Sequence, residues 1–332
     1  MKKSQNPLTD YYASARLITE LITLEDELRK VRYLSPFAPA PSIAHQITGV
    51  ILISLALGNI LQKNKQTINL NHILGLTLWH DAPEARYGDI GRDQRKYLVI
   101  NEEKARADMF GTLSFGLELI ELIEEFEGGG TDLNIKIAKD ADALYVICTI
   151  KDLLEKGISI NKPDVRIEKT LNRMTTEEGF KLGQEMAGKS IKQIWSLIKD
   201  YAGIDKAFTL SDSYATILAV AWLLVDLSKN ANLKKHNVLN TILKVTKTKA
   251  NKEEKNIAID AKVLYELLVS KRELLEGKRK NNNFKRILQK LKTVEGKKLG
   301  DILYEIDLYD WWNLMMGYAF LKEDGSVEYK KR

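Results

Sequence analysis

The chain has 332 residues, of which 44% are hydrophobic, with only 6 prolines and 20 glycines. This length equals about two average domains, and the hydrophobic content excludes a chain that is disordered over most of its length. The low glycine and proline content argues against collagen-like, linker-like and turn-rich all-β proteins. The single cysteine, Cys148, cannot close an internal disulfide, which suits a reducing compartment. We therefore expect a cytoplasmic protein that folds without disulfides.

The net charge of +6 is unevenly distributed. Residues 1–200 contain 26 basic and 28 acidic side chains, whereas residues 201–332 contain 25 basic and 17 acidic ones, and residues 234–298 alone contain 19 and 7. This change predicts two units, residues 1–204 and residues 205–332, of which the second is a basic α-helical domain. Its lysines could bind the phosphates of a nucleic acid or form a solvated surface, and no specific nucleic-acid motif accompanies them.

The predicted secondary structure is almost entirely helical. Residues 23–32 are expected to form a short helix that starts in a capping-box-like sequence at Thr23, and Pro36, Pro39 and Pro41 then predict an extended loop. Residues 42–61 are nearly all apolar or small, which predicts a central buried helix. Further helices are expected at residues 69–81, 102–126, 132–156, 213–229, 236–248, 256–277, 282–293 and 297–322.

The prediction is therefore an all-α fold, a helical bundle followed by a second basic helical domain. No alternating strand pattern and no internal repeat is apparent. The longest apolar runs, residues 49–61 and 214–225, are shorter than the ~20 residues that cross a bilayer, so we expect no membrane association.

A histidine and an aspartate stand next to each other at the end of an apolar helix, at His80 and Asp81. Burying an imidazole and a carboxylate without partners costs several kcal/mol, on the order of 2–7 for a neutral polar group alone. One divalent metal ion (Mn, Co, Ni, Zn or Fe) would relieve that cost, because these metals accept imidazole nitrogen and carboxylate oxygen. Two neighbouring ligands are too few, and His45 and Asp142 are further candidates because both lie near the start of apolar helices.

The sequence here resembles the HD-domain metal-dependent phosphohydrolases, and within them the 5′-deoxynucleotidase-like branch, over about residues 15–160. Three segments carry the resemblance: Ser42-Ile43-Ala44-His45, His80-Asp81-x-x-Glu84-x-x-x-Gly88-Asp89 and Lys139-Asp140-Ala141-Asp142-Ala143-Leu144. The resemblance implies an HD-domain helical bundle in which His45, His80, Asp81 and Asp142 bind one metal ion. Asp140 remains an alternative to Asp142, because the two aspartates stand in the same segment.

The resemblance also implies the roles of residues around the metal. Glu84 and Asp89 would orient and deprotonate the attacking water and protonate the leaving alkoxide, while the metal polarises the phosphate. Arg32 would hold the phosphate by charge-assisted hydrogen bonds, and Tyr33 would close on the sugar. From the residues alone, Arg32 could equally lie on a solvated helix face and Tyr33 could be a packing residue.

The expected function is the hydrolysis of (deoxy)nucleoside 5′-monophosphates by metal-activated water, with a nucleotide as the substrate partner. An alternative is an HD-type nuclease or dNTP phosphohydrolase that acts with the basic C-terminal helical domain. The helicase-associated HD nucleases usually carry Gly-Lys shortly after the His-Asp pair, whereas this chain has Pro83-Glu84, which favours the nucleotidase. A second alternative is a non-catalytic nucleic-acid-binding or assembly protein, and a homo-oligomer remains open.

Overall fold

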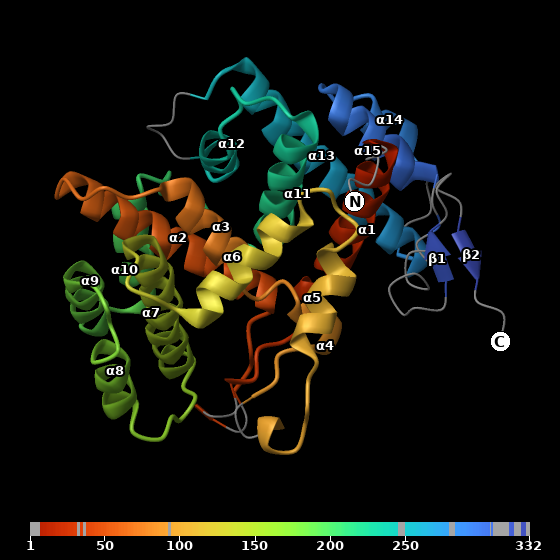
Figure 1. Ribbon diagram of the computed structural model, residues 1–332. Helices are drawn as coiled ribbons and strands as arrows, with labels where there is room; N and C mark the ends of the chain where they lie inside the picture. Colours follow the sequence, from red (N-terminus) through yellow and green to blue (C-terminus); the bar gives the residue numbers. More distant parts are fainter. Residues whose placement is uncertain are drawn as a thin grey trace.

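The computed structural model describes residues 7–31, 34, 35, 38–91, 94–244, 250–278, 283–305, 307, 319–321 and 327–329. At its centre lies α2 (Ile43–Lys63), surrounded by other helices (Figure 1). Its start is fixed by Ser42, whose side chain accepts a hydrogen bond of 3.0 Å from the backbone N–H of His45. By length and composition α2 could cross a membrane, which the shorter predicted run did not suggest, but 83% of its apolar window is buried inside the protein. The core therefore accounts for its apolar character.

The helices follow one another along the chain with short connections. The first part contains α1 (Pro7–Leu21), the 3-10 helix η1 (Ile22–Glu25), α2, α3 (Leu70–Trp79), α4 (Glu84–Tyr87), the 3-10 helix η3 (Gln94–Lys96), α5 (Glu102–Phe110), α6 (Gly116–Gly128), α7 (Leu133–Glu155), α8 (Pro163–Leu171), α9 (Glu177–Ala187) and α10 (Ile191–Ala202). The second part contains α11 (Ser213–Ser228), α12 (Lys235–Ile242), α13 (Lys252–Leu275), α14 (Phe284–Leu288) and α15 (Val294–Glu305).

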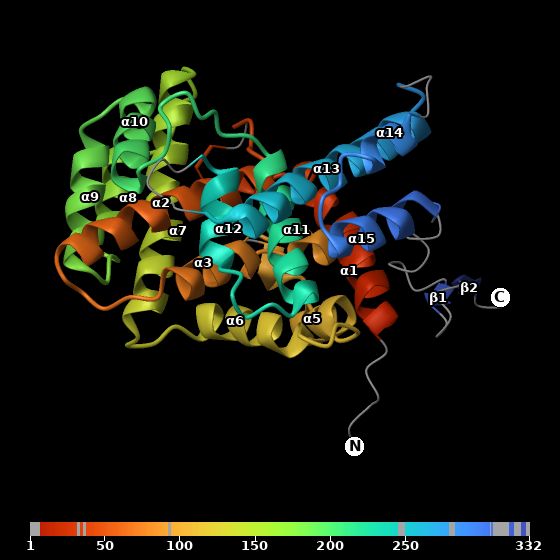
Figure 2. The ribbon, with the colours of Figure 1, turned by 90° about the horizontal axis from the view of Figure 1, so that it is seen from above.

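Helices from both parts of the chain share one hydrophobic core. α2 packs against α3, α7 and α10 on the side of the first part, and against α11 on the side of the second. α1 lies against α11 and α15, so the first helix of the chain is placed among the last ones (Figure 2). The predicted boundary at residues 204 and 205 falls between α10 and α11, and the division into two units stays a prediction.

The all-α prediction is confirmed for the helical body, and one small addition was not foreseen. β1 (Ala319–Leu321) and β2 (Val327–Tyr329) form an antiparallel hairpin in which Phe320 pairs with Glu328. α1 and the helices α8 to α10 were also not singled out by the sequence patterns. The predicted helix at residues 297–322 ends at Glu305, while residues 306 and 308–318 lie outside the described part.

The helix predicted at residues 282–293 covers only α14, and two predicted helices of the first part were also wrong in extent. The helix expected at residues 23–32 stops at the end of η1, because the chain then pairs with the proline loop: Leu28 forms a β-bridge with Ser42, and the Arg29 N–H donates to the Pro41 carbonyl at 3.0 Å. The helix expected at residues 102–126 is divided into α5 and α6. At the division a Cβ on Gly116 would lie 1.9 Å from the Phe110 carbonyl oxygen, so only glycine allows this close turn.

Candidate metal site

His80 lies at the C-terminal end of α3 and is buried, with 7% of its surface exposed. Its Nδ1 lies 2.9 Å from the Thr77 carbonyl oxygen, which can only accept a hydrogen bond, so Nδ1 carries the proton. Nε2 lies 3.1 Å from Asp81 Oδ2, at ion-pair distance. Burial lowers the pKa of His80, but the neighbouring Asp81 carboxylate raises it above the ordinary value. In a metal-binding imidazole one nitrogen is usually bonded to a carbonyl, as Nδ1 is here, and the other faces the metal.

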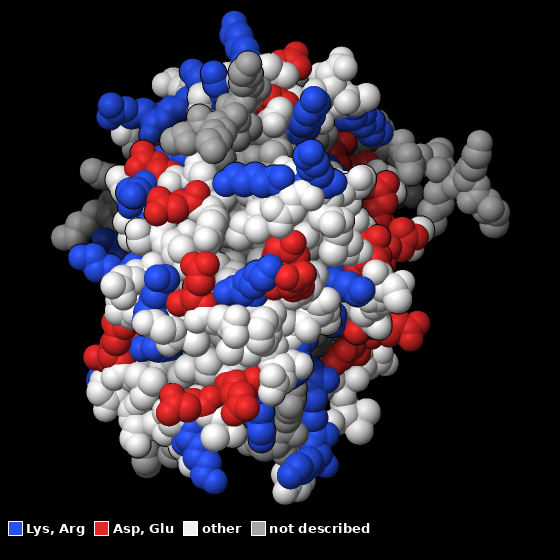
Figure 3. Space-filling view, turned by 90° about the vertical axis from the view of Figure 1, so that its left-hand side faces the viewer, with Lys and Arg blue, Asp and Glu red and all other residues white. Residues whose placement is uncertain are grey.

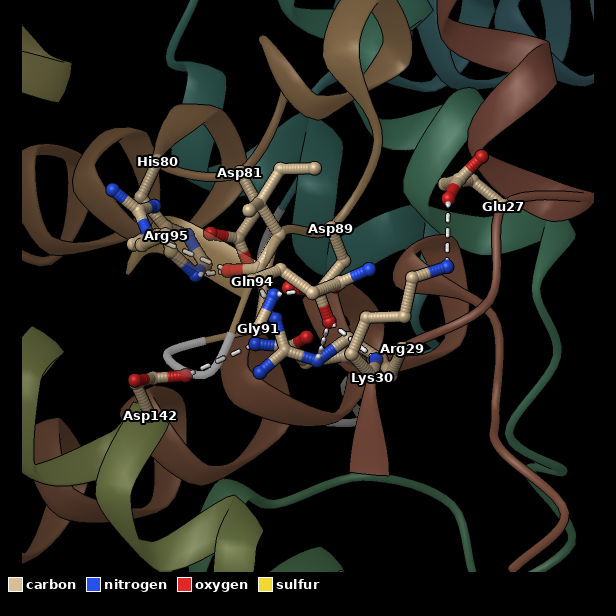
Figure 4. A network of polar contacts seen from close by, with 12 residues as sticks. Glu27, Arg29, Lys30, His80, Asp81, Asp89, Gly91, Gln94, Arg95 and Asp142 are labelled. Carbon is tan, nitrogen blue, oxygen red and sulfur yellow. Dashed lines mark hydrogen bonds and ion pairs between the residues drawn. The ribbon is translucent and has the colours of Figure 1, made fainter. Parts of the chain in front are cut away.

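Asp81 is the centre of a charge network with Arg29 (Figure 4). The Arg29 guanidinium lies 3.3 Å from Asp81 Oδ2 and 3.5 Å from Asp89 Oδ2, and it is partly buried between the two carboxylates. Burial alone would raise the pKa of Asp81, but His80 and Arg29 lower it to about 2. Asp81 is therefore a carboxylate at any physiological pH, as a metal ligand must be.

Asp89 is held in place by backbone as well as by side chains. The backbone N–H of Lys30 donates to Asp89 Oδ2 at 2.6 Å. Gly88, directly before it, has a φ of 75°, which is the left-handed region that glycine adopts without strain. This turn ends α4 and returns the chain toward the segment that carries Arg29.

Asp142 reaches the site from α7 and is linked to α2 by a side chain that the sequence patterns did not identify. Gln46 Nε2 donates to Asp142 Oδ1 at 3.0 Å, and a hydrogen bond from Gln46 also lowers the pKa of Asp81. The helix that carries Asp142, α7, packs directly against α3, which ends at His80. Asp142 and Gln46 therefore lie on the side of the site formed by α7 and α2.

Asp140, the alternative to Asp142, has a different surrounding. It is 1% exposed, and both of its oxygens accept hydrogen bonds at the start of α9. The donors are Thr175 N at 2.8 Å, Thr175 Oγ1 at 2.9 Å, Thr176 N at 2.9 Å and Thr176 Oγ1 at 2.6 Å. With four donors already bonded, Asp140 fixes α9 against α7 and leaves Asp142 as the aspartate that faces the site.

Glu84 is the first residue of α4 and is buried beside the charge network. Burial, and then the negative charges of Asp81, Asp89 and Asp142, raise its pKa well above the ordinary value, although Arg29 acts in the opposite direction. Its Oε2 has no hydrogen-bond partner among the described residues. Glu84 is thus a carboxyl group that can hold a proton close to Asp81.

Among the described residues, His45 has no ion pair or hydrogen bond with the other predicted ligands. Its Nδ1 lies 2.9 Å from Asp212 Oδ1, and its ring lines a cavity of about 670 Å³ together with Tyr145, Trp195 and Phe208. Successive residues of a helix point about 100° apart, so Gln46, the next residue, faces Asp81 and Asp142 while His45 faces the cavity.

The other sequence-derived site residues divide into two groups. The structure brings together His80, Asp81, Glu84, Asp89 and Asp142. Arg32 and Tyr33 lie outside the described residues, so the predicted substrate-binding roles stay predictions.

Arg29, Gln46 and Asp212 are contacts that sequence reasoning missed. Gln46 carries a signal in retrospect, because it is a large amide in the first turns of a helix that is otherwise apolar and buried. Arg29 has only a weak signal, since it stands in a basic run next to Lys30. Asp212 has none, because it is 167 residues away from His45 in the sequence.

The donor atoms of this site fit a metal ion, although within the described residues no three His, Cys, Asp or Glu side chains converge closely enough to hold one as they stand. Three polar atoms at the site are buried and have no hydrogen-bond partner in the described part of the chain: His80 Nε2, Gln46 Oε1 and Glu84 Oε2. Buried polar atoms of this kind are costly unless a ligand, ion or water satisfies them. Imidazole nitrogen, amide oxygen and the carboxylates of Asp81 and Asp142 together suit a divalent transition metal.

Residues 50–185 match the family model described as HD domain. The search of curated proteins found no match. Among solved structures, the crystal structure of the PH0347 protein from Pyrococcus horikoshii OT3 is similar, with 22% sequence identity, coverage of 52% of this chain and 97% of that chain, and a TM-score of 0.44. The family match begins inside α2, ends in α9 and contains every residue of the cluster from His80 to Asp142. The segment that holds these residues therefore has the sequence pattern of an HD domain.

Proposed function

We propose that this protein is a metal-dependent phosphomonoesterase that hydrolyses nucleoside 5′-monophosphates, with deoxynucleotides as preferred substrates. The observation that carries the proposal is the buried pair of His80 and Asp81, in which the imidazole is fixed by the Thr77 carbonyl and Nε2 is turned to the Asp81 carboxylate. An imidazole and a carboxylate at a buried helix end, with a second carboxylate facing them, are typical of a single-metal hydrolytic site.

We assign His80, Asp81 and Asp142 as the ligands of one divalent cation. Gln46 Oε1, a buried oxygen without a partner among the described residues, is assigned to the fourth position instead of the predicted His45. When bound, such a cation polarises a phosphate oxygen and lowers the pKa of bound water to near 7, as in other metal hydrolases.

The surrounding residues supply proton transfer and orientation. Burial raises the pKa of Glu84, so its carboxyl group holds a proton to higher pH than an ordinary glutamate and can deliver it to the leaving alkoxide. Asp89 is oriented by the Lys30 N–H and Arg29, so its carboxylate can accept a proton from the attacking water. Arg29 spans Asp81 and Asp89, which fixes both carboxylates relative to each other.

The cavity beside His45 supports a nucleoside as the remainder of the substrate. Tyr145, Trp195 and Phe208 give it aromatic walls, and Asp212 adds a polar group. Flat aromatic walls favour a flat heterocycle such as a nucleobase. Its volume of about 670 Å³ is sufficient for a mononucleotide-sized ligand.

The alternative of a nuclease or dNTP phosphohydrolase is favoured by one observation, the 19 basic against 7 acidic side chains of residues 234–298. Such a surface could bind a polyanion near the site. The third candidate is a non-catalytic helical binding protein. It gives no reason for His80 and Glu84 to have buried polar atoms without hydrogen-bond partners among the described residues, and it therefore explains less of the structure.

A phosphate-release assay distinguishes the three candidates. The purified protein is incubated with Mn²⁺ or Co²⁺ and with dNMPs, NMPs, dNTPs or single-stranded DNA. We expect phosphate release from monophosphates, fastest with dNMPs, and its loss together with bound metal in Asp81→Ala. His72→Ala is the matched control, because His72 forms an ion pair with Glu125 on α6, outside the cluster. Release only from dNTPs or DNA would favour the alternative, and no release from any substrate would overturn the enzyme proposal.

A further inference from the structure

Two buried aspartates in different parts of the chain form the same hydrogen-bond pattern. Asp260 on α13 is 0% exposed and Asp140 on α7 is 1% exposed. Asp260 accepts from Lys292 N at 2.7 Å, Thr293 N at 2.7 Å and Thr293 Oγ1 at 2.6 Å, as Asp140 accepts from Thr175 N, Thr176 N and Thr176 Oγ1. In both places the threonine caps the following helix: Gly179 N donates to Thr176 Oγ1 at 3.0 Å, and Gly296 N to Thr293 Oγ1 at 2.9 Å.

The sequences around the two aspartates correspond. Residues 137–145 read Ile-Ala-Lys-Asp-Ala-Asp-Ala-Leu-Tyr, and residues 257–265 read Ile-Ala-Ile-Asp-Ala-Lys-Val-Leu-Tyr. Residues 176–183 read Thr-Glu-Glu-Gly-Phe-Lys-Leu-Gly, and residues 293–300 read Thr-Val-Glu-Gly-Lys-Lys-Leu-Gly. The expectation of no internal repeat was therefore wrong. Most residues differ between the two copies of the repeat, and α5 and α6 have no counterpart. The similarity therefore becomes visible only when the structure shows which helices correspond.

Close contacts between helices repeat as well. A Cβ on Gly179 would lie 2.4 Å from Asp140 Oδ2, and one on Gly296 would lie 2.3 Å from Asp260 Oδ2. The next glycines of the two segments, Gly183 and Gly300, each contact a pair of equivalent leucines: Leu171 and Leu144 in the first case, Leu288 and Leu264 in the second.

The helix arrangement repeats in the same order. α7 packs against α2, α3, α8 and α9, and α13 packs against α11, α12, α14 and α15 (Figure 1). α3 and α12 share a further detail, since Thr77 Oγ1 donates to the Ile73 carbonyl and Thr241 Oγ1 donates to the Asn237 carbonyl. This match aligns His80, three residues after Thr77, with Lys244, three residues after Thr241.

Two side-chain contacts to carboxylates also connect the two sets of helices at the place where α2 packs against α11. His45, three residues after Ser42, contacts Asp212 just before α11, and Thr216, three residues after Ser213, donates to Glu25 in η1 before α2 at 3.2 Å.

At the positions that bind metal in the first set, the second set carries positive charge. Lys262 replaces Asp142, and Lys244 replaces His80. Lys244 follows α12 and Lys262 lies on α13, and these two helices pack against each other as α3 and α7 do. Burial and then the charge of Lys244 lower the pKa of Lys262. Within the part of the chain that the structure describes, neither lysine is in an ion pair. Figure 3 shows further lysine and arginine side chains at the upper end of one face, at the height of α12 in Figure 1.

We propose that α11 to α15 are a second, degenerate copy of the HD-type helical unit, which binds no metal and instead binds a phosphate group through Lys244 and Lys262. This inference rests on the proposed function, because that proposal assigns the metal ligands of the first unit. A phosphate placed between two ammonium groups relieves their mutual repulsion and accepts a charge-assisted hydrogen bond from each. The phosphate can belong to a free nucleotide or to a nucleic-acid backbone.

Amine labelling of the full-length Asp81→Ala variant tests the phosphate site without a contribution from the first unit. Modification of individual lysines is followed by peptide mass spectrometry with inorganic phosphate, dAMP or single-stranded DNA present. We expect phosphate and dAMP to slow the labelling of Lys244 and Lys262, and to leave Lys192, an exposed lysine on α10, unchanged. Protection of both lysines by DNA alone would identify the nucleic-acid backbone as the source of the phosphate. No selective protection by any probe would overturn the proposal.

Two further measurements separate this inference from the proposed function. In the double variant Lys244→Ala/Lys262→Ala, phosphate affinity should fall by about tenfold or more, the loss expected for one charge-assisted hydrogen bond, and Lys192→Ala should leave it unchanged. Metal counting should give one equivalent for the wild type and none for Asp81→Ala. One equivalent retained in Asp81→Ala would contradict a metal-free second unit, whereas no metal in the wild type would contradict the proposed function and leave the labelling result valid.

Discussion

Gln46 Nε2 lies 3.0 Å from Asp142 Oδ1, so an amide of α2, and not the imidazole of the preceding residue, reaches the acid of α7. We expect Gln46→Ala to weaken metal binding by about 10–100-fold, as loss of an oriented partner usually does. Gln46→His should retain binding, because an imidazole is a good ligand for the same metals. The measurement is a metal titration of the chelator-treated protein.

His45→Ala is the matched control for this prediction. Its imidazole contacts Asp212 and the cavity, so its loss should change metal affinity little while it changes the KM for nucleotides. If His45→Ala abolished metal binding and Gln46→Ala had no effect, the ligand set expected from the sequence would be correct and the assignment of Gln46 would be wrong.

Substitutions of Asp140 and Asp142 should have different effects, the first on stability and the second on metal binding. Asp140→Asn places an NH₂ group against donors from Thr175 and Thr176, so we expect a loss of roughly 1.5–3 kcal/mol in the free energy of unfolding, with metal affinity per folded molecule retained. Asp142→Asn should lower metal affinity with little loss of stability. Urea denaturation and metal titration of both variants test this, and the reverse pattern would make Asp140 the ligand.

The features that the sequence predicts well are local ones. His80 and Asp81 are adjacent in the chain, so a single helix end brings them together in any fold that contains this helix. The apolar run of α2 likewise predicts a buried helix because its composition leaves no polar face. The spacing from the pair to Glu84 and Asp89 is short enough for one turn to place both acids.

The features that the sequence predicts poorly depend on the rotation of a helix about its axis and on contacts between residues that are far apart in the sequence. Whether His45 or Gln46 faces the site is decided by a rotation of about 100° of α2, which is fixed by its packing against α3, α7, α10 and α11. The site of Arg29 depends on a β-bridge between Leu28 and Ser42, which no helical pattern indicates. The repeat of α7 in α13 was hidden because the ligand positions themselves have changed.

Arg29 should be a large stabilising residue of the metal-free protein. It is partly buried between Asp81 and Asp89, and removal of one partner from a fully buried charge network costs about 3–5 kcal/mol, which is the upper bound here. We therefore expect Arg29→Met to lose up to that amount of unfolding free energy, and added metal to restore part of it by neutralising the carboxylates. Arg95→Met is the control, because Arg95 forms an exposed ion pair with Glu102 that should be worth less than about 1 kcal/mol. Equal effects of the two substitutions would show that the buried network contributes nothing.

Glu84 should act in turnover and not in metal binding. In Glu84→Gln the proton donor is lost while the side chain keeps its shape, so kcat should fall by about 10²–10⁴-fold, the range for a positioned acid or base. Bound metal, counted on the purified variant, should remain one equivalent. Metal loss in Glu84→Gln would identify Glu84 as a ligand, and unchanged kcat would remove it from the reaction.

The raised pKa of Glu84 also predicts how stability depends on pH. In the unfolded chain Glu84 titrates near its ordinary value of 4.5, whereas in the folded protein burial and Asp81 hold the proton to higher pH. Between these two pKa values the folded state binds more protons, so this residue makes the unfolding free energy fall as pH rises. Glu84→Gln lacks that dependence. Without metal, its unfolding free energy should have the same slope with pH as the wild type below about pH 4.5, and it should gain stability relative to the wild type as pH rises above 4.5. Urea denaturation across this range measures the difference, with Glu103→Gln as an exposed control; a constant difference at every pH would show that the pKa of Glu84 is not raised.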